Sequence, residues 1–137
     1  MNRQDTVYQI ERSFRTIFRK FKRDINNLLG DNLSTNEFIV IKLLLDSGPR
    51  KVSEISSELN VSASHITSVG DSLVKKGYVI RVRSNEDRRV VQLDITPNGK
   101  EVVRELEIIK INYMKSRFEQ FSYEELDLFL HLVKKLE

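Results

Sequence analysis

The fold is decided by residues 61–95, which read VSASHITSVGDSLVKKGYVIRVRSNEDRRVVQLDI. Apolar residues recur in the first half of this segment at intervals of three and four, namely Ile66, Val69 and Leu73. The spacing predicts a helix over about 62–76 with one buried side, and Gly77 is typical of the residue that ends such a helix. Apolar and polar residues then alternate on both sides of the polar segment 84–89, which is the pattern of a β-hairpin. The segment therefore predicts a helix followed directly by a two-stranded ribbon.

Two further helices are predicted upstream. Ser34 and Glu37 have the S-x-x-E spacing of a capping box, which predicts a central, largely apolar helix that begins at Ser34 and stops at 47–49. A short helix over about 53–59 follows, and the tight turn 60–62 separates it from the next helix. The order is therefore helix, helix, turn, helix and ribbon.

Long amphipathic helices are predicted at both ends of the chain. Residues 5–29 carry an apolar stripe at helical spacing, and we interpret the basic residues between as a solvated face. Thr96 and Pro97 are typical of a helix start, and this helix is predicted to run to about Gln120, with a last helix from Ser122. These stripes exceed what one small domain can bury, although burial within the same chain is the alternative.

Composition excludes several kinds of site. The chain of 137 residues has no cysteine, which excludes disulfides, thiolate zinc sites and thiol redox switches. Its two histidines, His65 and His131, lie far apart, so a metal site is not expected. No cofactor is expected either. The N-terminal segment has no apolar signal-peptide core and no apolar run approaches the ~20 residues of a membrane span, so we expect no membrane partner and a cytoplasmic location.

We do not expect an enzyme. The sequence shows no Ser/His/Asp set, paired-carboxylate motif, P-loop or glycine fingerprint. Four of the five glycines fall at a predicted helix start or end, and only Gly70 does not. The net charge of +3 is compatible with a polyanionic partner but is weak evidence for one. The position of the charges is more informative than their sum.

The outward side of the predicted helix 62–76 is rich in small polar side chains. With its three apolar residues buried, the outward set is Ser62, Ser64, His65, Thr67, Ser68, Asp71, Ser72 and Lys75. Hydroxyl groups bond phosphates and base edges alike, and the N-terminus of a helix attracts phosphate through its free N–H groups. The alternative is an ordinary soluble helix surface. We favour DNA contact because a hairpin follows immediately.

The predicted hairpin concentrates positive charge. Arg81, Arg83, Arg88 and Arg89 lie within nine residues, and Asp87 lies two residues before Arg89. A carboxylate in a tight turn can orient a guanidinium through a charge-assisted hydrogen bond. The alternative is a solvated turn of mixed charge. Helix, turn, helix and charged ribbon are typical of a winged helix-turn-helix, in which a helix fits the major groove and the ribbon reaches the backbone or the minor groove.

Nearly the whole chain resembles the MarR family of bacterial transcription regulators. The most specific segments are 61–67 (VSASHIT), 73–79 (LVKKGYV), 85–89 (NEDRR) and 93–99 (LDITPNG). Within the third segment, Asp87-Arg88-Arg89 fits the D-x-R signature of the family's wing. These segments together, and not D-x-R alone, carry the resemblance.

The resemblance implies a fold class and a domain organisation. The fold is expected to be mainly α with a small β-hairpin wing. A winged helix-turn-helix domain would cover 31–96, an N-terminal dimerisation helix 1–30 and C-terminal dimerisation helices 97–137. In the homodimer that the resemblance implies, these terminal helices would intertwine, which would account for the apolar stripes at both ends.

The resemblance also implies a function, that of a dimeric repressor that binds double-stranded DNA at a pseudo-palindromic operator. Each recognition helix would lie in a major groove about 34–36 Å from its mate. Arg89 would enter the adjacent minor groove, oriented by Asp87. Ser68 stands where many family members carry arginine, so we expect sequence preference to rest on groove shape, or on His65 and Ser64.

Regulation is less defined by the sequence. Many family members are released from DNA by small, often phenolic, anions, so a small-molecule effector is expected without a placed pocket. We interpret Phe14, Phe18 and Tyr113 as ordinary core and not as the wall of such a pocket. The modest charge and the missing arginine at position 68 leave one alternative function, a winged-helix protein-interaction module without DNA binding.

Overall fold

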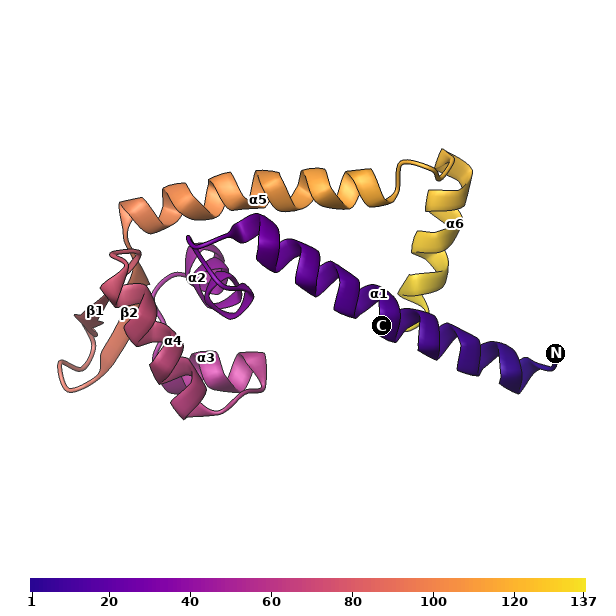
Figure 1. Ribbon diagram of the computed structural model, residues 1–137. Helices are drawn as coiled ribbons and strands as arrows, with labels where there is room; N and C mark the ends of the chain where they lie inside the picture. The colour runs from indigo at the N-terminus through magenta and orange to yellow at the C-terminus, as the bar shows by residue number, and fades with distance from the viewer.

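The computed structural model describes residues 1–137. Six helices and one antiparallel hairpin follow each other in the order α1 (Arg3–Leu29), α2 (Thr35–Ser47), α3 (Val52–Leu59), α4 (Ala63–Lys75), β1 (Val79–Arg83), β2 (Val91–Ile95), α5 (Pro97–Arg117) and α6 (Tyr123–Lys134) (Figure 1). The predicted fold class, mainly α with a small hairpin wing, is confirmed. The long helix α5 is shorter than predicted, because it ends at Arg117 and not near Gln120. Three aromatic rings from the turn and α6, those of Phe118, Phe121 and Phe129, pack together at this point and bend the chain.

Side-chain caps set the beginnings of the helices. Four hydroxyl groups accept a hydrogen bond of 3.0–3.1 Å from the backbone N–H three residues on: those of Ser34, Ser62, Thr96 and Ser122. Each satisfies a backbone donor that has no partner within its helix. At the other end of α4, Gly77 adopts a φ of +81°, which a residue with a side chain rarely adopts. The N–H groups of Gly77 and Tyr78 donate to the carbonyls of Val74 and Leu73, which completes a Schellman motif.

One hydrophobic core joins α2, α3, α4, the hairpin and the first half of α5. Sixteen buried apolar residues form this cluster, including Ile66, Val69 and Leu73 of α4, as the helical spacing predicted. Leu29 and Leu33 extend the cluster to the end of α1 and the turn that follows it. The apolar side of α4 is therefore fixed, and its polar side faces outward.

The ribbon is anchored at its base. β1 and β2 pair antiparallel, with Val79 opposite Ile95, and both of these side chains are buried. Arg50, just before α3, exchanges two backbone hydrogen bonds of 3.1 and 2.8 Å with Leu93 of β2. α4 approaches the same leucine so closely that a Cβ added at Gly70 would lie 3.1 Å from its Cδ1 atom. These contacts fix the direction of the ribbon relative to α4.

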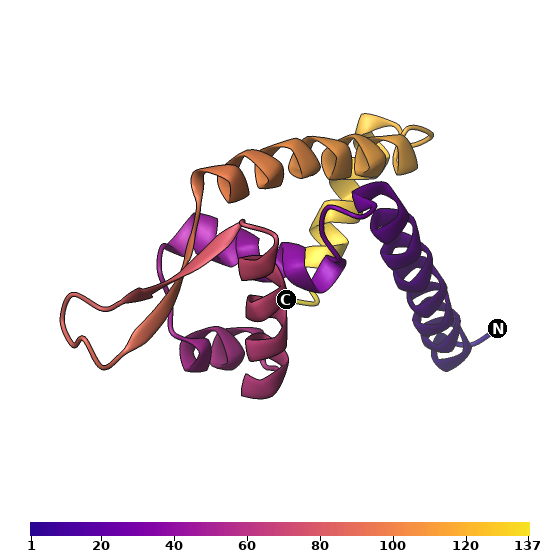
Figure 2. The same ribbon diagram turned by 60° about the vertical axis from the view of Figure 1, so that its left-hand side comes forward.

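The terminal helices extend away from this core. In Figure 1, α1 projects from α2 to the side opposite the hairpin, and α5 leads to α6, which returns towards α1; Figure 2 shows the hairpin at one extreme of the molecule. α1 contributes only Leu29 to the buried residues, and α6 contributes none. Tyr113 of α5 joins the two long helices, because its hydroxyl donates a hydrogen bond of 2.6 Å to Asp24 of α1. None of the helices combines the length and the apolar composition that crossing a membrane requires.

An apolar cavity of about 490 Å³ lies between α1, α5 and α6. Its lining is dominated by aromatic side chains, those of Phe14, Phe18, Phe21, Phe118, Phe121 and Phe129. The interpretation of Phe18 as core is wrong, since this residue is 64% exposed, and Phe14 is only half-buried. The reason is that α1 diverges from α5 and leaves the first part of its apolar stripe uncovered. Tyr113 is buried, as expected.

Candidate nucleic-acid interface

α4 presents a hydroxyl-rich side to solvent. The exposed residues on this side are Ser62, Ser64, Thr67, Ser68, Asp71 and Lys75. His65, which the sequence placed in the same set, is half-buried. The hydroxyls lie in the first half of the helix and Lys75 in its last turn. One helix face therefore carries neutral hydrogen-bonding groups at its N-terminal end and a cation at its C-terminal end.

Local hydrogen bonds orient several of these hydroxyl side chains. Ser62 Oγ accepts from the N–H of His65 at 3.1 Å and lies 3.2 Å from Ser64 Oγ. Thr67 Oγ1 donates to the carbonyl of Ala63 at 3.0 Å. A hydroxyl that donates in this way keeps its oxygen lone pairs for a further partner. The first turn of α4 thus offers both donors and acceptors to a ligand that approaches from solvent.

Ser72 does not belong to this outward set, contrary to the sequence interpretation. Its side chain is only half-exposed, and its Oγ donates a hydrogen bond of 2.8 Å to Oε2 of Glu37 on α2. The helical spacing placed Ser72 beside the buried residues of α4, but the side to which it belongs depends on how α2 packs there. Ser72 is therefore a contact between helices.

The tip of the ribbon carries a compact acid–base pair. Asp87 Oδ1 accepts from the backbone N–H of Arg89 at 3.0 Å and from its Nε at 3.3 Å. The backbone hydrogen bond from Arg89 and then the side-chain bond hold the pKa of Asp87 below its ordinary value. The side chain of Arg89 is nevertheless 92% exposed. The guanidinium is therefore held at its base and open to solvent at its remaining donors, and Arg88 beside it is exposed as well.

The other two arginines of the ribbon are engaged within the protein. Arg81 on β1 pairs with Asp71 on α4, which ties the ribbon to that helix. Arg83 Nη1 donates to the carbonyl of Arg88 at 2.8 Å and so supports the loop at the tip. Both residues are exposed, but part of their donor capacity is used in these contacts.

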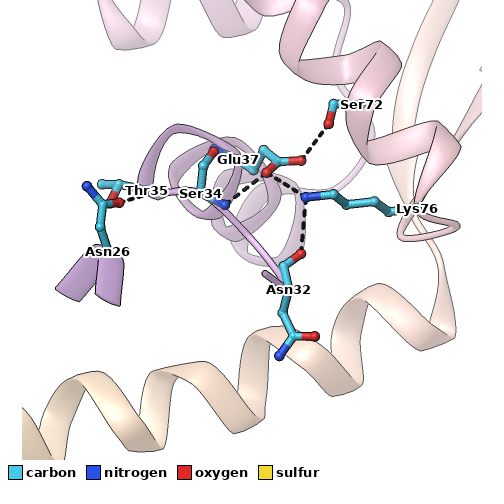
Figure 3. A network of polar contacts seen from close by, with 7 residues as sticks. All are labelled: Asn26, Asn32, Ser34, Thr35, Glu37, Ser72 and Lys76. Atoms are coloured by element: carbon cyan, nitrogen blue, oxygen red, sulfur yellow. Dashed lines mark hydrogen bonds and ion pairs between the residues drawn. The ribbon is translucent and has the colours of Figure 1, made fainter. Parts of the chain in front are cut away.

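Sequence reasoning missed a polar network behind α4 that is centred on one buried carboxylate. Glu37, predicted only as a capping residue, is 6% exposed and accepts from the N–H of Ser34 at 2.9 Å. It also accepts from Ser72, as described, and from Lys76 Nζ at 2.8 Å (Figure 3). Burial alone would raise the pKa of Glu37, but the hydrogen bonds from Lys76, the Ser34 N–H and Ser72 outweigh it and lower this pKa. The S-x-x-E pattern was the only signal in the sequence for this residue.

This face presents hydroxyl groups, backbone N–H groups and guanidinium groups to solvent. No group of three histidine or carboxylate side chains comes together where it could hold a metal ion. Hydroxyls on a helix next to exposed guanidinium groups on a ribbon are groups that bond phosphates and base edges. This arrangement of groups is suited to binding a double-stranded nucleic acid through its phosphates and the base edges in its grooves.

Comparisons with known proteins agree with this description. The family model described as "MarR family" matches residues 33–91. The HTH-type transcriptional regulator YpoP from Bacillus subtilis is 38% identical over 135 residues, which cover 98% of this chain and 96% of that protein.

Two solved structures are similar over almost the whole chain. A MarR family protein from Bacillus stearothermophilus has a TM-score of 0.86 at 26% identity and covers 99% of this chain and 95% of its own. FabT from Streptococcus pneumoniae, in complex with DNA, has a TM-score of 0.82 at 27% identity and covers 95% of this chain and 94% of its own.

Proposed function

The chain belongs to the MarR family of transcription regulators, and on that premise we propose that it binds a pseudo-palindromic operator as a homodimer and represses transcription there. The single observation that carries this proposal is the hydroxyl-rich outer side of α4 beside the arginine-tipped ribbon. α4 is then the recognition helix in the major groove, and the ribbon is the wing.

The exposed residues receive distinct roles in this proposal. Ser64, Thr67 and Ser68 bond base edges or phosphates from the first half of the recognition helix, and Lys75 contacts a phosphate from its last turn. Ser62 and His65 complete the surface at the helix N-terminus. Because Ser and Thr read bases less selectively than a bidentate arginine, groove shape contributes to sequence preference.

In the wing, we assign Arg89 to the minor groove and Arg88 to the adjoining backbone. A narrow minor groove has an enhanced negative potential that attracts an inserted arginine. Asp87 orients Arg89, while Arg81 and Arg83 hold the ribbon in position and direct their remaining donors to phosphates.

The homodimer is supported by the area that the single chain exposes. The chain exposes 10145 Å². A compact monomer of 16.1 kDa exposes about 7,400 Å², so that the excess is about 2,700 Å². Two chains together have about twice this excess, and permanent homodimers bury about 2,000–5,000 Å² or more counted over both partners. The terminal helices carry many of the exposed apolar residues, including Ile10, Ile17, Phe18, Ile108, Ile111, Leu128 and Leu132.

We therefore propose that 1–30 and 97–137 form the dimerisation part and 31–96 the DNA-binding domain. The second copy also covers the cavity between α1, α5 and α6, because the cavity lining is continuous with the exposed apolar residues of α1 and α6. A small-molecule effector would then act on the dimer by changing the distance between its two recognition helices. Repression follows where the operator overlaps a promoter, since a dimer on two adjacent major grooves occludes that DNA.

The experiment that tests this function is selection of a duplex from a random pool with the full-length protein, followed by hydroxyl-radical footprinting. We expect an inverted repeat with two protected regions about one helical turn apart. The affinity for this duplex should fall linearly on a plot of log affinity against log salt concentration.

A failure to enrich any duplex at low salt would overturn the proposal. It would favour the alternative of a winged-helix protein-interaction module, in which a protein partner is retained after both Arg88 and Arg89 are replaced by alanine.

A further inference from the structure

In addition to its apolar contacts with the core, the C-terminal end of the recognition helix is hydrogen-bonded to one buried carboxylate, that of Glu37. Glu37 lies in the first turn of α2, and its two oxygens are shared between its own helix and α4. Oε1 accepts from Lys76 Nζ at 2.8 Å, and Oε2 accepts from Ser72 Oγ at 2.8 Å (Figure 3). These donors lie one turn apart, at the C-terminal end of α4. Two bonds one turn apart fix both the position and the rotation of that end.

The same network includes the connection from α1. Lys76 Nζ also donates to the carbonyl of Asn32 at 3.3 Å, in the turn between α1 and α2. Thr35, the first residue of α2, donates from its N–H to Asn26 Oδ1 of α1 at 3.2 Å. A chain of polar contacts therefore runs from α1, through the start of α2, to the recognition helix.

Other capping carboxylates in the chain do not have this role. Glu54 and Glu125 occupy the equivalent capping-box position of α3 and α6 and accept from the backbone N–H of Lys51 and Ser122 at 3.0 and 2.9 Å. Both side chains are exposed, whereas Glu37 is buried. Burying a charged carboxylate costs desolvation free energy, and this cost is offset only when hydrogen-bonding or ion-pair partners are in place. The burial of Glu37 therefore points to the contact with α4 and not to the cap alone.

We propose that Glu37 is a positioning residue for DNA binding, which fixes the recognition helix α4 relative to α1 through Ser72 and Lys76. This inference rests on the proposed function, since it assigns the network to the geometry of DNA contact. Two recognition helices must match the spacing of successive major grooves, so the angle between α4 and the dimerisation helix α1 enters the affinity directly.

The length of α4 makes this angle important. Ser64 lies eight residues from Ser72, which is about 12 Å along a helix that rises 1.5 Å per residue. A rotation of about 10° at the Ser72 end displaces the hydroxyls near Ser64 by about 2 Å, which exceeds the range over which a hydrogen bond persists. Loss of the contact between Ser72 and Glu37 is therefore expected to weaken the contacts that the hydroxyls near Ser64 make with DNA.

The test compares Glu37→Gln with Glu54→Gln, which removes the same charge from a capping box in the same domain. The probe is the duplex selected by the wild-type protein, and binding is measured at a temperature where circular dichroism shows every variant to be folded. If Glu37 acted only through its charge, its removal would strengthen binding to a polyanion, as in the control. The proposal predicts the opposite sign, a loss of about fivefold or more for Glu37→Gln and no loss for Glu54→Gln.

A double-mutant cycle makes the result specific to the network. Ser72→Ala and Lys76→Met are milder changes that leave the cap of α2 intact. Each should weaken binding, and combination of either with Glu37→Gln should add less than the sum of the single losses. Equal affinity of Glu37→Gln and Glu54→Gln, or full additivity of both pairs, would overturn the proposal.

Amide hydrogen exchange without DNA separates this inference from the proposed function. Loss of the network should speed exchange at 73–76 and at 31–35 in Glu37→Gln and leave α3 unchanged. If the wild-type protein enriches no duplex, the role of Glu37 in DNA affinity is lost together with the proposed function. Exchange at 73–76 then decides the remaining claim, that Glu37 fixes the end of α4, and unchanged rates there overturn it.

Discussion

Asp87 accepts hydrogen bonds from both the backbone N–H and the guanidinium of Arg89, at 3.0 and 3.3 Å, and yet the arginine side chain stays 92% exposed. Asp87 thereby restricts the orientation of the Arg89 side chain. The remaining N–H donors of the guanidinium stay available to another partner. A preoriented cation loses less conformational freedom on binding than a free one. This geometry supports the proposed role of Arg89 in binding an anion of the DNA.

Arg89→Ala should weaken binding to the selected duplex by about tenfold, which is the usual cost of a lost arginine contact to DNA. Asp87→Asn gives the more informative result. If Asp87 only repelled phosphates, its neutralisation would strengthen binding. If it orients Arg89, binding should weaken by about threefold despite the removed negative charge. Fluorescence anisotropy at fixed salt measures both, and tighter binding by Asp87→Asn would contradict the orienting role.

Lys75→Gln should change the salt dependence of binding. Each phosphate contact contributes a slope of about 0.9 to the plot of log affinity against log salt concentration. We expect the magnitude of the slope to fall by about this amount. Lys22→Gln on the exposed side of α1 makes the same charge change and is the control. A similar slope for both variants would remove Lys75 from the interface.

Glu37 should make stability depend on pH in the acid range. Its pKa is lowered from the ordinary value of 4.5, because the bonds from Lys76, the Ser34 N–H and Ser72 outweigh the opposing effect of burial. A carboxyl with a lowered pKa stabilises the folded state above its unfolded pKa, and this stabilisation is lost as pH falls through the folded value. The Tm of the wild type should thus exceed that of Glu37→Gln at pH 7, and the difference should shrink below about pH 4.5.

This comparison isolates one group. Asp24 and Asp87 also have lowered pKa values, the former chiefly through the hydrogen bond from Tyr113, but both are present in the two proteins. A difference in Tm that stays constant from neutral to acid pH would show that the lost contacts do not depend on the charge of Glu37.

Gly99→Ala should destabilise the winged domain. A Cβ at this position in the first turn of α5 would collide with the carbonyl oxygen of Tyr78, which is backbone and cannot move aside. Overpacking of this kind costs about 1–3 kcal/mol. Asn98→Ala, at the exposed neighbouring position, is the control. Urea denaturation of both variants checks the prediction, and equal midpoints would contradict it.

Leu132→Ser should weaken self-association without unfolding the chain. Leu132 on α6 is 50% exposed in the single chain, so a polar replacement loses little packing there. In a dimer that covers α6, the same change should raise the dimer dissociation constant by about tenfold. Sedimentation velocity over a range of concentrations measures this, with Lys135→Ser as the control. A wild-type protein that sediments as a monomer at all concentrations would end the dimer proposal.

The elements of the fold could be predicted because their signals are local. Ser34 and Thr96 each cap the helix that follows directly by accepting a hydrogen bond from the N–H three residues on, and the alternation on either side of residues 84–89 indicates a β-hairpin. Such signals are less precise at the end of α5, which stops at Arg117 with Phe118 as its C-cap, next to the aromatic cluster that Phe118 forms with Phe121 and Phe129.

The contacts behind the candidate site could not be predicted, because they join residues distant in sequence. Glu37 and Lys76 are 39 positions apart, and Ser72 and Glu37 are 35 apart. Spacing along α4 assigns Ser72 to a helix face but does not show which element covers that face. The polar turn around Arg89 was enough to predict that this residue is exposed. The ion pair between Arg81 and Asp71 could not be predicted, because it joins two different elements.

The sparse burial of α1 and α6 has a consequence for dosage in the cell. If two chains must meet before either can hold its long helices in place, the number of DNA-competent molecules grows as the square of the chain concentration while pairs are scarce. Occupancy of an inverted repeat then rises more steeply than simple one-to-one binding allows. A gene under this control would switch over a narrow range of protein synthesis, without any cooperativity beyond that of assembly.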